Sequence, residues 1–68
     1  MNVTARTMPD GRVHQVGLPE GATSGTLVRA LGMPTAGCLV LRGRLPLPID
    51  EALVDGDELE VIYVASGG

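Results

Sequence analysis

The sequence predicts an α+β fold, in which a mixed sheet of four to five strands carries one main helix on one face. Apolar and polar residues alternate near both ends of the chain, at 2–7 and 58–64, as they do in half-buried strands. Between these segments, residues 23–31 repeat apolar side chains at helical spacing. The connection through this helix places it against the inward side chains of the sheet.

The first two strands are expected to form a hairpin. In residues 2–7, Val3 and Ala5 lie on the same side of the strand. The sequence Pro9-Asp10-Gly11 follows and is a strong turn signal. Residues 13–18 then predict the returning strand.

The helix is predicted over residues 23–31. Thr23 is a suitable N-cap, with Ser24 as the neighbouring candidate. Gly32 stands where a helix commonly ends. Gly25 lowers the intrinsic helix propensity of this segment, by about 1 kcal/mol relative to Ala in a helix interior and by less in the first turn.

The second half of the chain predicts two further strands and a weak edge piece. Residues 38–42 form an apolar strand, in which Leu39 and Leu41 are expected to face the core. Residues 45–49 contain two prolines and are at best an edge strand. Residues 50–54 predict a helical turn or irregular structure, and 55–57 a tight turn. The last strand, 58–64, places Leu59 and Val61 on its inner face. We therefore expect one domain over 1–64, followed by a C-terminal tail at 65–68.

Composition excludes several classes of function. The chain has 68 residues and a formal net charge of -3, and its basic residues are scattered Arg, so we expect no direct nucleic-acid binding. No apolar run approaches the length of about 20 residues needed to span a membrane, and no signal peptide is expected. Cys38 is the only cysteine, which excludes an intrachain disulfide and favours a cytoplasmic protein. The sequence contains no Lys and therefore cannot form lysine-linked chains on itself.

Three internal segments and the last two residues carry a family resemblance. The segments 27–31, 39–44 and 53–62, with the terminal Gly67-Gly68, resemble the ubiquitin-like β-grasp proteins. The resemblance covers nearly the whole chain. It is greatest to the small sulfur carriers of thiamine and molybdopterin synthesis and to the small archaeal ubiquitin-like modifiers. It implies a β-grasp fold.

The resemblance also implies a function for the chain end. An E1-like adenylyltransferase would use ATP and Mg²⁺ to convert the Gly68 carboxylate into an acyl-adenylate. A sulfur-donor enzyme would then give a thiocarboxylate for a sulfur-acceptor enzyme, as in thiamine synthesis, tRNA thiolation or molybdopterin synthesis. Alternatively, a target-protein lysine would give an isopeptide bond. A further alternative is a non-covalent β-grasp interaction domain. On these readings the chain is a protein co-substrate without enzyme activity and binds no cofactor itself. Gly67 and Gly68 suit the role because residues without Cβ fit a narrow channel.

A partner surface is predicted near the third and last strands. Val40 and Ile62 are assigned outward positions and are expected to form an apolar patch. We predict that this patch binds a partner, because exposed aliphatic patches often mark interfaces. Arg42 and Arg44 are either its charged rim or ordinary solvated turn residues. Ser66 is assigned to the same partner-binding set.

Other reactive residues predict no additional site. Cys38 begins an apolar strand without an evident base beside it, so we interpret it as a packing residue. His14 is interpreted as a residue at the core margin, and one His with one Cys does not make a zinc site. The acidic residues of 51–60 are interpreted as a solvated turn, with complementarity to a basic partner as the alternative.

Overall fold

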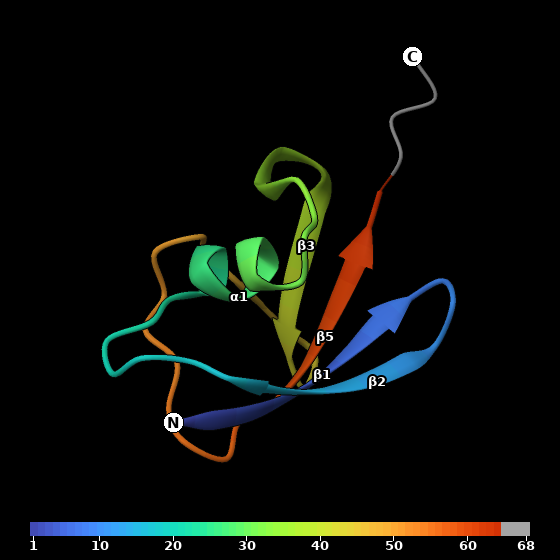
Figure 1. Ribbon diagram of the computed structural model, residues 1–68. Helices are drawn as coiled ribbons and strands as arrows, with labels where there is room; N and C mark the ends of the chain where they lie inside the picture. Colours follow the sequence, from blue (N-terminus) through green and yellow to red (C-terminus); the bar gives the residue numbers. More distant parts are fainter. Residues whose placement is uncertain (65–68) are drawn as a thin grey trace.

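A mixed sheet of five strands carries α1 on one face in the computed structural model, which describes residues 1–64 (Figure 1). The strand order is β2-β1-β5-β3-β4. This is the predicted α+β arrangement, with all five strands present. The helix α1 spans Ser24–Ala30 and a 3-10 turn, η1, spans Thr35–Gly37. The strands are β1 Asn2–Met8, β2 Arg12–Gly17, β3 Cys38–Arg42, β4 Leu45–Leu47 and β5 Glu58–Tyr63.

The last strand lies in the middle of the sheet. It pairs with β1 in parallel, from Thr4 opposite Glu58 to Met8 opposite Ile62. On its other side it pairs with β3 in antiparallel fashion. The predicted hairpin of β1 and β2 is confirmed, and the proline-containing β4 lies at the sheet edge, as predicted. Among residues 1–64, no helix has the length and apolar composition needed to cross a membrane.

The helix begins at the N-cap that the sequence predicts. The Thr23 side chain accepts a hydrogen bond from the Thr26 backbone N–H at 3.3 Å, and the Thr23 N–H donates to Thr26 Oγ1 at 3.1 Å. This reciprocal pair satisfies two amides that the first turn leaves unpaired. At the other end, Gly32 adopts a φ of 74° and its N–H donates to the Arg29 carbonyl at 2.9 Å. Gly32 therefore ends the helix as predicted.

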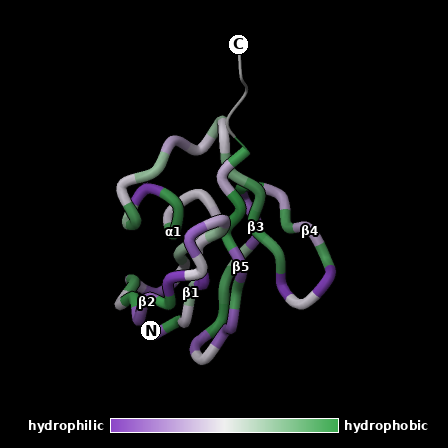
Figure 2. The backbone as a smooth tube through the Cα atoms, turned by 90° about the vertical axis from the view of Figure 1, so that its right-hand side faces the viewer, coloured by the Kyte–Doolittle hydropathy of each residue, from purple (hydrophilic) through white to green (hydrophobic). Residues whose placement is uncertain are grey.

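The core lies between α1 and the inner face of the sheet. Residues 38–41 of β3 are all apolar, and Figure 2 shows this strand as mostly hydrophobic, so its inward side cannot be chosen from polarity. The prediction that Leu39 and Leu41 face the core is wrong. Val40 is 4% exposed and belongs to the core, whereas Leu39 is 39% exposed. Val40 lies opposite Val61 in β5, which is fully buried, and residues opposite each other share a face. The buried core residues are Val3, Ala5, Leu18, Ala22, Leu27, Val28, Val40, Leu47, Leu53, Leu59 and Val61.

Close packing explains the glycine near the start of the helix. A Cβ added at Gly25 would lie 2.8 Å from Ile49 Cγ1 and 3.2 Å from the Ile49 carbonyl oxygen. The Gly25 N–H also donates to that carbonyl at 2.8 Å. The segment after β4 thus approaches the helix backbone so closely that any larger residue at position 25 would require Ile49 to shift.

We therefore expect Gly25→Ala to destabilise the fold, although Ala is the better helix former. The overlap with Ile49 should cost about 1–3 kcal/mol in the free energy of unfolding, measured by urea denaturation. Gly17→Ala is the matched control, because a Cβ there would meet only Asn2 Oδ1 at an ordinary 3.6 Å. Equal stability of the Gly25 variant and the wild type would contradict the packing argument.

Candidate functional site

The carboxyl end of β5 is the element of the described structure that is nearest in the sequence to the predicted reactive residues. It lies at the end of the sheet opposite the N-terminus (Figure 1). Ser66, Gly67 and Gly68 lie outside the described residues, so their assigned roles stay predictions. The described chain ends at Val64, whose N–H donates to the Gly37 carbonyl at 2.7 Å. This bond extends the β5–β3 pairing by one step and fixes where the chain leaves the sheet.

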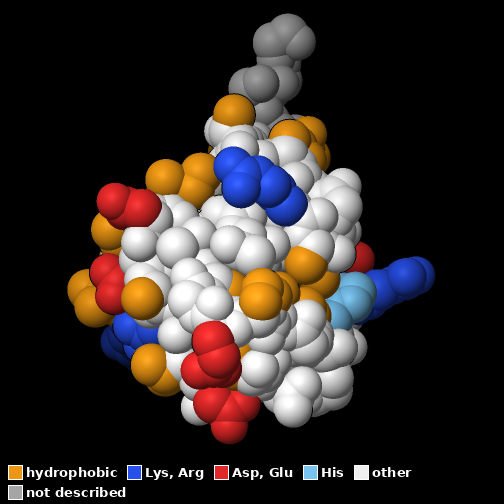
Figure 3. Space-filling view, turned by 60° about the vertical axis from the view of Figure 1, so that its left-hand side comes forward, with side chains coloured by type: hydrophobic (Ala, Val, Ile, Leu, Met, Phe, Trp, Pro, Cys, Tyr) orange, Lys and Arg blue, Asp and Glu red, His pale blue; other side chains and the backbone are white. Residues whose placement is uncertain are grey.

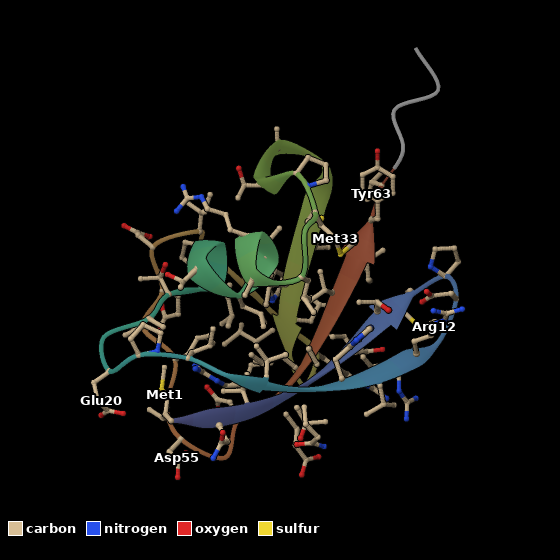
Figure 4. The ribbon with its side chains drawn as sticks, viewed as in Figure 1. Met1, Arg12, Glu20, Met33, Asp55 and Tyr63 are labelled. Carbon is tan, nitrogen blue, oxygen red and sulfur yellow. The ribbon has the colours of Figure 1, made fainter. Side chains whose placement is uncertain are left out.

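The aromatic ring of Tyr63 packs against the same glycine. A Cβ added at Gly37 would lie 2.9 Å from Tyr63 Cε1, so the ring occupies space that only glycine leaves free. Figure 4 shows Tyr63 at the end of β5. The side chain is 42% exposed. The residue before Val64 is therefore held by side-chain packing as well as by the sheet.

An apolar row crosses the outer face of the sheet next to this exit. Leu39 lies opposite Ile62, and Ile62 lies opposite Met8 on its other side. Their sequence neighbours Val40, Val61 and Thr7 are buried on the helix side, so these three side chains belong to the opposite face. We call Met8, Ile62 and Leu39 the outer row. Leu39 is the most exposed of the three, and the other two are half-buried.

The predicted patch of Val40 and Ile62 therefore needs a correction. Val40 is a core residue and is not available to a partner. The outward position on β3 belongs to Leu39, one residue earlier, and this is the residue that the sequence prediction missed. The outward orientation of Ile62 is confirmed. Figure 3 brings forward the side of the molecule that carries α1, where hydrophobic side chains also lie next to the point at which the described chain ends and most acidic side chains lie further away.

Arg42 is held by internal contacts. Its Nε and Nη2 donate to the two carboxylate oxygens of Asp57, at 3.3 and 2.8 Å, and Nη2 also donates to the Ala52 carbonyl at 3.3 Å. Glu51 lies 3.9 Å from Nη1. Arg42 is therefore not an ordinary solvated turn residue, which was one of the two alternatives, and its role at the rim of a partner surface stays a prediction. Arg44 is exposed in the turn between β3 and β4, and its partner role stays a prediction.

The Arg42–Asp57 pair changes the protonation of both groups. The hydrogen bonds from Arg42 lower the pKa of the Asp57 carboxyl, and the Val54 N–H, which donates to Oδ2 at 2.9 Å, adds to this effect. The same pairing raises the pKa of the Arg42 guanidinium. Because charge-assisted bidentate pairs have defined geometry, this contact ties the end of β3 to the loop before β5.

Thr7, Asp10 and His14 form a separate polar cluster on the hairpin of β1 and β2. Thr7 Oγ1 donates to Asp10 at 2.7 Å and lies 3.3 Å from His14 Nε2, and the bond from Thr7 lowers the pKa of Asp10. Burial raises the pKa of the Cys38 thiol, which disfavours its thiolate form. Within residues 1–64, no group of three His, Cys, Asp or Glu side chains could hold a metal ion.

The architecture matches solved structures over its whole length. SAMP1 from Haloferax volcanii superposes with a TM-score of 0.76 and 24% sequence identity, covering 100% of both chains. The chain has the ubiquitin-like β-grasp fold. The ubiquitin of Caldiarchaeum subterraneum superposes with a TM-score of 0.74 and 18% identity, covering 100% of this chain and 98% of that one. A scan against protein-family models and a search of curated proteins gave no match. At these identities the likeness concerns the fold, and the β-grasp prediction is confirmed.

The Arg42–Asp57 contact gives the β-grasp domain a predictable response to acid. Since the pKa of Asp57 is lower in the folded state, the pair stabilises the fold at neutral pH. This contribution falls as the pH drops from the ordinary carboxyl pKa, about 3.9, through the lowered value. We expect Asp57→Asn to lose about 1–3 kcal/mol in the free energy of unfolding at pH 7.

The difference between Asp57→Asn and wild type should shrink as the pH is lowered in denaturation experiments. Asp50→Asn is the control, because it removes the same charge from an exposed residue. A difference that stays constant down to strong acid would show that the ion pair is not its source.

Proposed function

We propose that this protein is a sulfur carrier that reacts through the carboxylate of Gly68. The observation that carries the proposal is the full-length β-grasp fold, in which β5 leads directly toward the terminal Gly67-Gly68 of the sequence. Because glycine has no Cβ, a chain end that consists of two glycines can enter a narrow site in another protein. The chain then acts as a co-substrate, and an E1-like adenylyltransferase supplies ATP and Mg²⁺.

The proposed chemistry has two steps, the first at the α-phosphorus of ATP and the second at the terminal carbonyl carbon. The carboxylate attacks the α-phosphate of ATP, and pyrophosphate leaves as the acyl-adenylate forms. A sulfide equivalent from a sulfur-donor enzyme then attacks the carbonyl, the C–O bond to the phosphate breaks, and AMP leaves. The product is a C-terminal thiocarboxylate, ready for a sulfur-acceptor enzyme. Adenylation is needed because a free carboxylate has a poor leaving group.

The outer row is the surface we propose for the activating enzyme. Met8, Ile62 and Leu39 lie side by side on three strands, and Ile62 is only two residues before Val64. A partner that binds this row therefore contacts the part of β5 that immediately precedes the last described residue, Val64. Apolar side chains at the centre of an interface provide much of its affinity.

A protein modifier is the second candidate. It is favoured by the likeness of the fold to the ubiquitin of Caldiarchaeum subterraneum. In this case the amine of a target-protein lysine attacks the same activated carbonyl, AMP leaves, and an isopeptide bond forms. Because the sequence contains no Lys, no lysine-linked chain can be built on it. The two candidates share the activation step and differ only in the nucleophile that follows.

Intact-mass analysis of the protein isolated from its own host tests the proposal. We expect a species whose mass has increased by the replacement of one oxygen with sulfur, and we expect this species to be absent from Gly68→Ala. Larger species in which Gly68 is joined to a target lysine would instead support the modifier. If neither species is detected, under sulfur-replete and stressed conditions alike, both covalent functions are refuted and a non-covalent β-grasp domain is the remaining candidate.

The outer row can be tested separately with matched Leu→Asp variants. We expect Leu39→Asp to weaken binding to the activating enzyme by about 10- to 100-fold, because it places a charge within an apolar contact. Leu45→Asp is the control, since Leu45 is 63% exposed and lies on the edge strand β4, away from the outer row. Affinity is measured by calorimetry with the purified enzyme. Equal affinities of the two variants would exclude the outer row as the contact surface.

A further inference from the structure

A small cavity lies between the start of α1, the strand β3 and the segment that follows β4. Its volume is about 40 Å³. The aliphatic side chains that line it belong mainly to the hydrophobic core. Ser24 and Thr35 contribute hydroxyl groups to the wall, and Cys38 contributes a thiol. None of the wall residues is charged. They are Ser24, Gly25, Val28, Thr35, Cys38, Val40, Leu47 and Ile49.

Ser24 is the unusual residue in this wall. It is only 1% exposed, and its Oγ is buried without a hydrogen-bond partner in the part of the chain that the structure describes. A hydroxyl group can donate one hydrogen bond and accept two. Proteins seldom leave such a group unpaired in their interior, because its interactions with bulk water are lost on folding.

The backbone around Ser24 keeps the hydroxyl in place. The Ser24 N–H donates to the Glu51 carbonyl at 3.0 Å, and the next N–H, of Gly25, donates to the Ile49 carbonyl at 2.8 Å. These bonds join the helix to the segment after β4. Because Ile49 also packs directly on Gly25, Ser24 cannot move toward solvent without breaking this contact.

We propose that the cavity is a binding site for one internal water molecule, held by Ser24 Oγ. A water needs only about 10–15 Å³ of such space and two to four polar partners, so the volume is sufficient. The hydroxyl of Thr35 and the thiol of Cys38 line the same cavity and are the further polar side chains within the wall. Organic ligands occupy pockets of about 300–1,000 Å³, which excludes them here. The uncharged wall disfavours an ion.

The proposed water joins three elements of the fold. Ser24 belongs to α1, Thr35 to η1 and Cys38 to the start of β3. Hydrogen bonds through a water between these elements stabilise the packing of the helix against β3. The site is independent of the proposed reaction at the chain end.

The test is to count long-lived internal waters in wild type and Ser24→Ala by oxygen-17 magnetic relaxation dispersion. We expect the variant to lose one such water. We also expect its Tm to fall by about 4 °C, because a satisfied buried hydrogen bond is removed. Ala30→Ser is the matched control. It measures the difference in helix propensity between Ser and Ala, since Ala30 is an exposed residue of the same helix.

An equal number of long-lived waters in both proteins would overturn the proposal, whatever the Tm. The control gives the difference in Tm between Ser and Ala at an exposed helix position. If Ser24→Ala raises the Tm by more than this difference, the proposal is also overturned, because removing an unpaired buried hydroxyl stabilises a protein. A high-resolution crystal structure of the unaltered protein tests the site without a variant. An ordered water within hydrogen-bond distance of Ser24 Oγ supports the site, and its absence contradicts it.

Discussion

The pairing of the first and last strands at the centre of the sheet is the constraint on which the rest of the structure depends. The inward residues of both strands are almost completely buried: Val3 and Ala5 on β1, and Leu59 and Val61 on β5. Their burial stabilises the fold by about 25 cal/mol for each Å² of apolar surface removed from water. Because β5 has a neighbour on each side, the strand that leads to the chain end is held by two ladders. The end of β5 is therefore fixed in space only when the whole sheet has formed.

The turn before β5 sets the register of this pairing. The Asn2 N–H donates to Asp55 Oδ1 at 2.7 Å, and the Gly56 N–H donates to the Asn2 carbonyl at 2.8 Å. The Thr4 N–H donates to the carbonyl of Asp57, whose side chain is bound by Arg42. A slip of one residue would turn Leu59 and Val61 toward solvent. The short turn and the single ion pair thus keep the correct face of β5 against the core.

The parts of the fold that were predictable from sequence are those whose signals are local. Thr23 and Gly32 mark the ends of α1 within a few residues of the apolar spacing that predicts it. The orientation of β3 was not predictable in this way, because residues 38–41 are all apolar and either face fits the core. Which side chains of β3 face the core is decided by its pairing with β5, which lies about twenty residues later in the chain. For the same reason the ion pair of Arg42 was not predictable, since its partner Asp57 is brought close only by the folded sheet.

The described part of the chain is suited to binding and offers little for catalysis. Asp10, Arg42 and Asp57 are each engaged with neighbours in their own domain, and burial keeps the Cys38 thiol in its neutral form. In the proposed function, the activating enzyme supplies the acid, base and metal for the reaction at Gly68. Fixing a chain end in a narrow site costs about 1–2 kcal/mol per residue. Complete burial of an aliphatic side chain returns about 1.5–3 kcal/mol. In the proposed function, burial of the outer row offsets only part of that cost, because Met8 and Ile62 are already half-buried and Leu39 is 39% exposed.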